Sequence, residues 1–244
     1  MKYASKTDIG KRVRNEDAFR VPSEEESRPL IAVSDGMGGH NGGTTASSMV
    51  IEGLGAELGA LSLSSDPVGA LKSAVQRINT SVFRRAESDP ALAGMGATLV
   101  CALLTEKHFI AANIGDSRLY HFDGETIEQI TTDHSYVEML AASGQISREE
   151  ARTHPQRNLI TRAVGISLRA ELDVFVREWQ PGDMLLLCSD GLHGCVEDEA
   201  IAEVLRGGAP LEEKCGSLVK LALESGGSDN ITVVLALCEG EDCA

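Results

Sequence analysis

The sequence predicts an α+β protein whose strands form antiparallel sheets. Strand-like runs follow one another in clusters with short turns between them, and short turns favour antiparallel pairing. Pairs of helical segments separate these clusters, unlike the regular strand–helix alternation of a doubly wound parallel sheet. The chain of 244 residues can bury a sizeable core, and no obvious linker divides it. We therefore expect a single domain over residues 1–244.

The first part of the chain is expected to contain three strands and then two long helices. The strand signals lie at residues 3–9, 17–21 and 30–34. Residues 42–61 begin with Thr and Ser residues suited to capping and continue with apolar residues at helical spacing, which predicts a long helix. The second helix should span residues 67–86, because Pro67 stands just inside its start. Its apolar residues recur at helical spacing on one face: Val68, Leu71, Val75, Ile78 and Val82.

Further strands and a polar segment are expected in the middle of the chain. Strand signals follow one another at residues 97–105, 108–114, 117–123 and 126–131. Residues 135–166 are more polar and predict short helices, one of them capped near Ser147, within an irregular loop. We expect this segment to form a mobile flap that selects substrates. The remaining elements are strands at 171–178, 184–188 and 231–238 and helices at 198–205 and 211–224.

Composition and charge exclude several classes of function. The net charge of −15 would repel phosphate backbones, so we expect no nucleic-acid partner. Cations or basic protein surfaces are better candidate partners, although solubility alone explains the acidic excess equally well. The N-terminus lacks the apolar core of a secretion signal, and no apolar run reaches the ~18 residues of a membrane helix. We therefore expect a cytoplasmic protein without a membrane span.

The cysteines do not form a metal-binding pattern. The six cysteines include no C-x-x-C pair and no Cys/His spacing typical of zinc sites. Cys101, Cys188 and Cys238 lie in apolar strand-like runs, which indicates reduced core residues. Cys243, beside the C-terminus, is expected to be exposed and prone to oxidation.

Four aspartates stand at the ends of predicted strands. Asp35 and Asp190 each follow an apolar run and precede a glycine, Asp116 lies between two strand-like runs, and Asp229 stands just before one. A single Asp-Gly pair is an ordinary turn signal, and a simple hairpin turn remains an alternative for Asp116. A carboxylate that leaves a buried strand needs a partner, however. Four of them predict a common site.

A cation site would explain why these carboxylates lie together. Gathered carboxylates raise one another's pKa and cannot all stay ionised without a cation. Mg²⁺ and Mn²⁺ prefer oxygen ligands, and the glycine after Asp35 would expose its carbonyl as one more ligand. Two such ions about 4 Å apart would activate a hydroxide nucleophile and hold a phosphoryl group, which predicts a phosphatase. Arg12 and Arg14, just before Glu16 and Asp17, are candidate donors to the phosphate.

Six segments occur in the order and spacing found in the metal-dependent serine/threonine protein phosphatases of the PP2C type, and the chain resembles the bacterial branch of that family. The segments are TDIGKRVRNEDAF, IAVSDGMGGH, GATLVCALL, ANIGDSRLY, LLLCSDGL and GSDNITVVL. They cover nearly the whole chain. The resemblance implies a sandwich of two antiparallel β-sheets flanked by α-helices. It also implies two Mn²⁺ or Mg²⁺ ions at one end, with a third, weaker site.

The resemblance also implies roles for individual residues. Asp35 would bridge the two ions as the central catalytic carboxylate, with the Gly36 carbonyl beside it. Arg12 would bind the substrate phosphate, and Asn230 would support the site through hydrogen bonds. The resemblance implies Asp190 and Asp229 as further ligands of the first ion. Glu16 and Asp17 would bind the second ion directly or through water, and Asp116 would bind the third together with Asp190.

The resemblance does not assign the general acid. Some family members carry a histidine directly after the Asp-Gly pair, but Met37 stands there in this chain. His40 and a metal-bound water remain alternatives. We interpret His134 and His154, in or beside the flap, as surface or hydrogen-bonding residues.

The sequence thus predicts a monomeric protein phosphatase that hydrolyses phosphoserine and phosphothreonine through a hydroxide activated by two metal ions. Its expected partners are phosphorylated proteins, among them a bacterial serine/threonine kinase and the substrates of that kinase. The alternative is a catalytically silent phosphoprotein-binding or sensing domain of the same fold. Such a domain would be expected to lack one or more metal ligands, whereas Asp35, Asp190 and Asp229 are all present.

Overall fold

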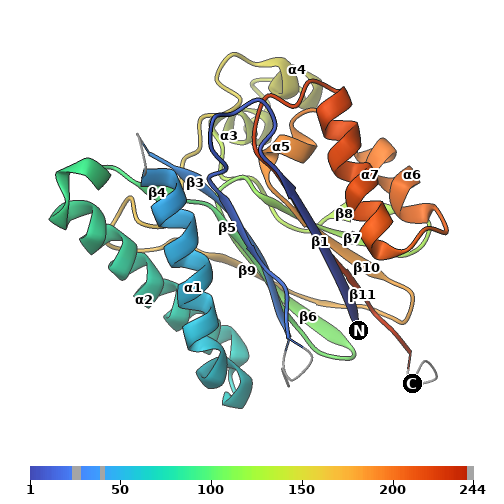
Figure 1. The fold of residues 1–244 in the computed structure, drawn as a ribbon, viewed down its shortest axis with the longest axis horizontal. Coiled ribbons are helices and arrows are strands. Elements are labelled where there is room, and N and C mark those ends of the chain that lie inside the picture. Colours follow the sequence, from blue (N-terminus) through green and yellow to red (C-terminus); the bar gives the residue numbers. More distant parts are fainter. Residues whose placement is uncertain (24–28, 39–41, 241–244) are drawn as a thin grey trace.

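The strands form two antiparallel sheets, as the sequence predicts (Figure 1). The computed structural model describes residues 1–23, 29–38 and 42–240. The first sheet has the order β1 (Lys2–Asp8), β11 (Ile231–Leu237), β10 (Met184–Cys188), β7 (Arg118–Phe122) and β8 (Ile127–Gln129). The second has the order β2 (Asp17–Arg20), β3 (Leu30–Met37), β5 (Leu99–Leu104), β6 (His108–Ile114) and β9 (Asp173–Glu178), with β4 (Gly96–Ala97) paired to β3.

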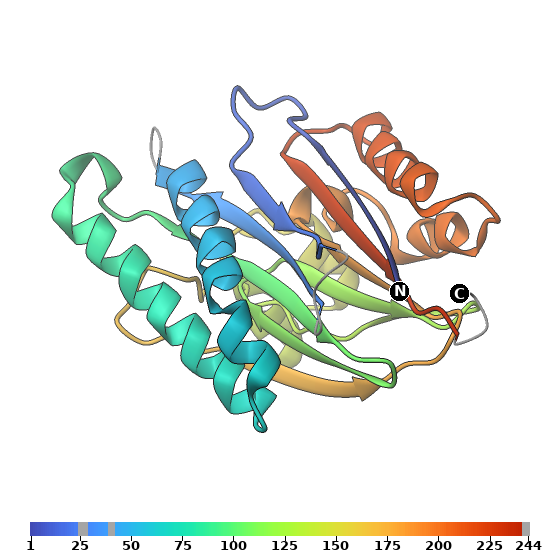
Figure 2. The same cartoon turned by 60° about the horizontal axis from the view of Figure 1, so that its bottom comes forward.

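Helices cover the outer face of each sheet, so the molecule has four layers (Figure 2). The second sheet is covered by α1 (Gly42–Leu63) and α2 (Pro67–Ser88). The first sheet is covered by α6 (Asp198–Arg206) and α7 (Leu211–Glu224). The short elements are the 3-10 helix η1 (Pro90–Leu92), α3 (Tyr136–Ala142), α4 (Arg148–Thr153) and α5 (Asp190–His193).

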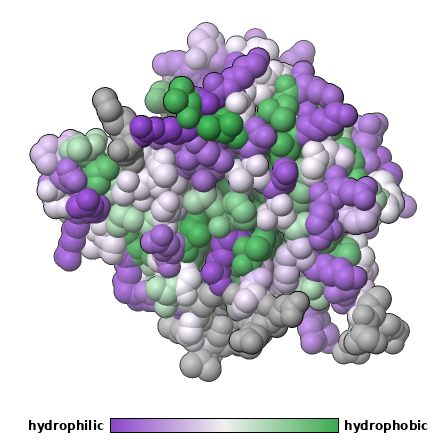
Figure 3. All heavy atoms as spheres, viewed as in Figure 1, coloured by the Kyte–Doolittle hydropathy of each residue, from purple (hydrophilic) through white to green (hydrophobic). Residues whose placement is uncertain are grey.

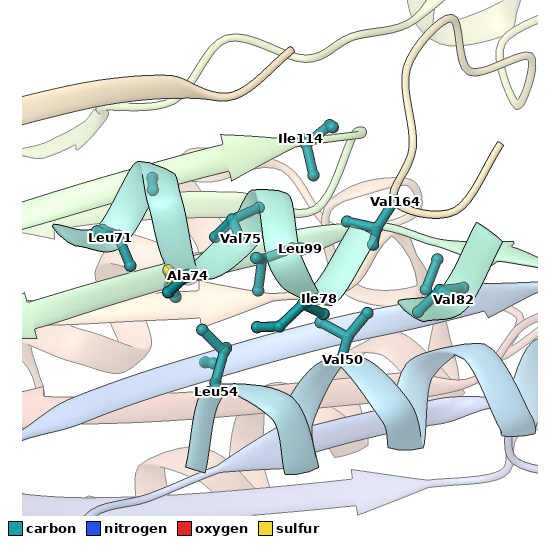
Figure 4. Close-up of a cluster of buried hydrophobic side chains, with 14 of the residues drawn as sticks. Val50, Leu54, Leu71, Ala74, Val75, Ile78, Val82, Leu99, Ile114 and Val164 are labelled. Carbon is teal, nitrogen blue, oxygen red and sulfur yellow. The ribbon is translucent and has the colours of Figure 1, made fainter. Parts of the chain in front are cut away.

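The apolar face predicted for α2 packs into the core. Asp66 caps this helix, because its Oδ1 accepts a hydrogen bond of 2.9 Å from the Gly69 amide. Figure 4 shows side chains of α2 between α1 and the sheet. A second apolar cluster lies under α6 and α7, and a third fills the space between the two sheets. These three clusters hold the layers together and leave the ends of the sandwich for polar residues.

The structure corrects three predicted boundaries near the aspartates. The strand expected to end at residue 34 continues to Met37, so Asp35 lies inside β3, opposite Asp17 of β2. The strand expected over residues 97–105 is divided at Thr98. The Thr98 amide donates to the Asp35 carbonyl (2.8 Å), and the Asp35 amide donates to the Thr98 hydroxyl (2.8 Å). The third correction is the one-turn helix α5, which directly follows β10 and begins at Asp190.

The structure confirms the burial predicted for three cysteines and leaves two other predictions untested. Cys101, Cys188 and Cys238 are buried, as predicted. Cys243 and His40 lie outside the described residues. No helix in the described ranges is long and apolar enough to cross a membrane. On the face drawn in Figure 3, hydrophilic residues cover most of the rim, in keeping with the net charge of −15.

Candidate active site

Most of the predicted site residues converge on one pocket. It lies at the end of the molecule where α3, α4 and α5 are found, away from the two termini (Figure 1). Its volume is about 660 Å³. The predicted residues that line it are Arg12, Glu16, Asp35, Gly36, Asp116, Asp190, Asp229 and Asn230. Asp17 is the predicted residue that does not line the pocket.

Asp17 lies behind the pocket, between Asp35 and the end of β10. It is the register partner of Asp35, and the Ser189 hydroxyl donates to its Oδ2 at 2.7 Å. Oδ1 of Asp17 and Oδ1 of Asp190 are buried and have no hydrogen-bond partner in the described chain. Buried carboxylate oxygens normally have partners. These two atoms therefore fit a cation or the water molecules around one.

Burial and mutual repulsion raise the pKa values of the gathered carboxylates. Burial, assisted by the charge of Asp229, raises the pKa of Asp190 to about 7. Burial also raises the pKa of Asp17 to about 6. The pKa values of Asp35 and Asp116 are raised as well, first by burial and then by the charges of Asp17 and Asp190, respectively. A divalent cation in the pocket would lower these pKa values again, because a nearby opposite charge favours the ionised form of a carboxylate.

The donors fit Mn²⁺ or Mg²⁺ better than zinc. All of them are carboxylate or carbonyl oxygens, which these hard cations prefer. Within the described residues, no group of three or more His, Cys, Asp or Glu side chains is arranged so that it could hold a metal ion without water or backbone ligands. Mg²⁺ keeps several water ligands and needs few carboxylates. An open set of oxygen donors around a pocket is therefore compatible with such ions.

The glycines that follow Asp35 and Asp190 allow neighbouring backbones to approach closely. A Cβ on Gly191 would lie 1.9 Å from the carbonyl oxygen of Asn230. A Cβ on Gly36 would lie 2.0 Å from the carbonyl oxygen of Gly43. Real Cβ atoms do not approach other atoms so closely, so only glycine fits at either position. The repeated Asp-Gly pair thus lets Asp35 lie directly beside the first turn of α1 and Asp190 beside the turn before β11.

Asn230 connects the loop before β2 to the turn that carries Asp229. Its side-chain oxygen accepts a hydrogen bond of 2.8 Å from the Glu16 amide. Its side-chain nitrogen donates to the carbonyls of Ile9 (3.0 Å) and Arg14 (2.9 Å). Asn230 is buried, so each of these bonds satisfies a group with little access to water. The three bonds place Glu16 relative to Asp229.

Arg12 reaches the pocket from the same loop. Its Nη2 donates to Oδ2 of Asp229 at 2.6 Å, and its side chain remains 55% exposed. The hydrogen bond to Asp229 raises the pKa of Arg12, so the guanidinium stays charged. Arginine has five N–H donors in a planar fork. It can therefore hold this carboxylate and still donate to a phosphate in the pocket.

The sequence interpretation missed several residues that shape the site. Thr98 holds the backbone of Asp35, and its hydroxyl lies 2.7 Å from that of Ser117. Ser189 joins the side chain of Asp17 to the amide of Thr232. Both lie within the six segments that resemble the family, and Ser189 stands directly before Asp190, which was the available signal. Pocket residues Asn158 and Ile160 come from the flap segment, where no motif marked them.

The flap segment, residues 135–166, is fastened at its base. Ser135 and Ile160 form an isolated antiparallel bridge near its ends. Just beyond residue 164, the Asn79 side chain of α2 accepts from the Gly165 amide (2.8 Å) and donates to the Ser167 carbonyl (2.8 Å). Gln76, one turn earlier, binds the next part of the same loop in the same way. The two side-chain amides fix one end of the flap to a long helix.

The two flap histidines take part in hydrogen bonds, in agreement with one of the two interpretations given to them. His134 is buried, so the surface interpretation is wrong for this residue. His154 is partly exposed, and its Nδ1 accepts a hydrogen bond of 3.1 Å from the Gln156 amide. Neither histidine lines the pocket.

Comparison with known proteins finds a matching family and similar solved structures. The family model described as protein phosphatase 2C matches residues 6–224. The serine/threonine phosphatase stp of Listeria monocytogenes is 39% identical over 234 residues, which cover 94% of this chain and 93% of that protein. The crystal structure of Stp1 from Staphylococcus aureus has a TM-score of 0.91 at 37% identity, over 98% of this chain and 95% of that one. The catalytic domain of PstP, solved in complex with 2 manganese ions, has a TM-score of 0.87 at 38% identity over 97% of each chain.

Proposed function

The chain belongs to the protein phosphatase 2C family, and on that premise we propose how its residues divide the work of hydrolysis. It is a metal-dependent serine/threonine protein phosphatase that acts on phosphoproteins. Its cofactors are divalent cations, in line with the manganese-bound PstP domain. The observation that carries the assignment of roles is the convergence of Arg12 and the predicted carboxylates on one pocket.

The carboxylates around Asp35 would hold two cations. In our proposal Asp35 would contribute to both, because the charges of Asp17, Asp190, Asp116 and Asp229 all act on its carboxylate. When bound, the ions activate a water molecule for attack on phosphorus and neutralise charge on the phosphoryl oxygens. For the first ion the other proposed ligands are Asp190 and Asp229. For the second they are Glu16 and the Gly36 carbonyl, and Asp17 would reach this ion through water. Asp116 and Asp190 would bind a third, weaker ion.

The chain's own residues orient the substrate and limit the sources of the proton. Arg12 is placed to bind a phosphoryl oxygen while it holds Asp229. Met37 lines the pocket after the Asp-Gly pair, and its thioether has no proton to donate. The proton for the leaving serine or threonine oxygen must therefore come from another group.

Release of phosphate from a phosphothreonine peptide tests the proposed function. The wild-type protein should release phosphate with Mn²⁺ or Mg²⁺ and should stop when the metal is chelated. A folded protein that binds Mn²⁺ and the peptide but releases no phosphate would instead support the silent phosphoprotein-binding domain. The presence of the proposed ligands Asp35, Asp190 and Asp229 in one pocket favours the enzyme.

Replacement of Arg12 with methionine is expected to raise the KM for the peptide about tenfold. A hydrogen bond to a charged group contributes about 1.5 kcal/mol at the lower end of its range, and about 1.4 kcal/mol corresponds to a factor of ten. Arg12→Lys should restore only part of the affinity, because an ammonium cannot form a planar fork. Steady-state kinetics would measure the change, with Arg77→Met as a control, because Arg77 pairs with Glu57 on the surface. An unchanged KM in Arg12→Met would remove Arg12 from the phosphate site.

Mn²⁺ is expected to raise the thermal midpoint more at about pH 7.5 than at about pH 5. The pKa of Asp190 is raised from 3.8 to about 7, and that of Asp17 to about 6. Between these values the folded metal-free protein binds more protons than the unfolded chain, so its stability falls as the pH rises. Cation binding offsets the repulsion between ionised carboxylates, and protons compete with it at low pH. Thermal denaturation with and without Mn²⁺ measures both shifts; equal shifts at both pH values would contradict the expectation.

We also propose that a serine/threonine kinase and its substrates are the physiological partners, and that the protein acts as a cytoplasmic monomer. Because Asn158 and Ile160 line the pocket, residues 135–166 would contribute to substrate choice. Exchanging this segment for that of a related phosphatase should change the order of preference among phosphopeptides. An unchanged order would assign substrate choice to another part of the surface.

A further inference from the structure

Asp116 lies in a tight turn between β6 and β7, and this turn is enclosed on several sides. Gly115 has a φ of +112°, a conformation that favours glycine. A Cβ at that position would lie 2.6 Å from a methyl carbon of Thr98. Asp116 itself is buried and lines the pocket together with Asp190. Small movements of the turn would therefore move its carboxylate relative to Asp190.

His193 holds the main chain of Asp116 from the side of α5. Its Nε2 lies 3.0 Å from the Asp116 carbonyl oxygen. A carbonyl only accepts hydrogen bonds, so Nε2 carries the proton and donates. The single turn of α5 therefore carries Asp190 at its first residue and holds Asp116 from its last.

His134 holds Gly115 from the side of the flap. Its Nδ1 accepts a hydrogen bond of 3.1 Å from the Gly115 amide, and its own amide donates to the Gly115 carbonyl at 2.8 Å. Because Nδ1 accepts, the proton lies on Nε2, which donates to Oδ2 of Asp173 at 3.0 Å. Arg162, at the base of the flap, binds the other oxygen of Asp173 at 3.2 Å. The ring is thereby fixed on both sides.

We propose that His134 and His193 are positioning residues that together hold the Gly115–Asp116 turn, so that the Asp116 carboxylate stays beside Asp190 to bind the third, weaker cation. Neither histidine lines the pocket, so neither touches the substrate. One ring acts as an acceptor for the turn and the other as a donor to it, which fixes two successive residues of the backbone. The inference rests on the proposed function, because it concerns a cation of the same centre.

A matched pair of substitutions at His193 tests the proposal. Glutamine and methionine have similar length, but only glutamine offers an N–H near the place of Nε2. We expect His193→Met to lower the affinity for the most weakly bound Mn²⁺ ion about tenfold or more. His193→Gln should retain most of this affinity. Electron paramagnetic resonance of free Mn²⁺ counts the bound ions without relying on activity. The Mn²⁺ concentration for half-maximal phosphate release should rise in parallel.

A second pair tests the same turn from the other side and covers the case in which His193→Met does not fold. At His134, asparagine keeps an acceptor near the place of Nδ1, whereas leucine has a similar size and none. His134→Leu should no longer bind the most weakly bound Mn²⁺ ion, and His134→Asn should still bind it. His108→Gln and His108→Met form the control pair, because His108 is exposed at the start of β6 and pairs with Glu178.

The double variant Asp116→Asn/His193→Met separates positioning from general stability. It should bind Mn²⁺ no more weakly than Asp116→Asn alone, because both changes act on one ligand. If His193→Met and His134→Leu bind all Mn²⁺ ions like the wild type, the proposal is wrong. If the folded wild type itself neither binds Mn²⁺ nor releases phosphate, the result contradicts the proposed function and not only the role of the histidines. Wild-type binding with unaffected variants would overturn only the role of the two histidines.

Discussion

Replacing Asp190 with asparagine is expected to abolish Mn²⁺-dependent hydrolysis of a phosphothreonine peptide, with a loss of about a thousandfold or more. Metal ions contribute several kcal/mol to the stabilisation of charge in such reactions. Asp190 has a buried oxygen without a hydrogen-bond partner in the described chain and lies in the same pocket as Asp35 and Asp229. A neutral amide would be a weaker ligand for the first cation. Phosphate release and Mn²⁺ binding would both report the loss.

The same substitution should leave the fold intact, which separates a ligand from a structural residue. Burial raises the pKa of Asp190 to about 7, so its ionised form destabilises the metal-free protein. Asp190→Asn should therefore be at least as stable as the wild type at neutral pH without metal. Asp123→Asn is a suitable control, because Asp123 follows β7 at the far end of that strand from Asp116. Asp190→Asn that keeps a tenth of the wild-type activity would contradict the proposed ligand set.

Substitution of Gly191 by alanine is expected to destabilise the protein by about 3 kcal/mol and to remove most of the activity. The added Cβ would lie 1.9 Å from the Asn230 carbonyl oxygen, so α5 and the turn before β11 must separate. Overpacking of this kind costs about 1–3 kcal/mol. The separation moves Asp190 away from Asp229, so activity falls as well. Urea denaturation and phosphate release measure the two effects.

Gly216 offers a matched control for this substitution. It lies inside α7, and a Cβ there would meet no atom within 4 Å. Gly216→Ala should stabilise the protein by about 1 kcal/mol, because alanine favours the helical conformation. A stable and active Gly191→Ala variant would show that the close approach between α5 and Asn230 is not needed for the site.

Local signals in the sequence were sufficient for most of the fold. The helix α2 was predicted over residues 67–86 and spans Pro67–Ser88, because Pro67 and an apolar face both lie within that segment. The strands were predicted where apolar runs lie between turn residues. The break between β4 and β5 was missed because it depends on hydrogen bonds between Thr98 and Asp35, which are 63 residues apart. The helix α5 was missed because a single turn is too short to show helical periodicity.

The chemistry of the site was also visible in the sequence. The aspartates stand beside apolar runs and glycines, and their oxygen donors predict hard cations whatever the details of the fold. The roles of individual residues came from the resemblance of six segments to the PP2C family. Eight of the nine residues named in this way line the pocket, and Asp17 lies behind it.

The sequence by itself therefore determined the class of fold, the acidic residues and the kind of cation they suit. Only the tertiary structure decided which groups meet. Arg12 pairs with Asp229 across 217 positions of sequence, and His193 binds the backbone of Asp116 across 77. Asn79 of α2 binds Gly165 of the flap, which lies 86 positions further along the chain. Such contacts depend on the packing of distant elements, and no local pattern records them, because each partner alone looks like an ordinary polar residue.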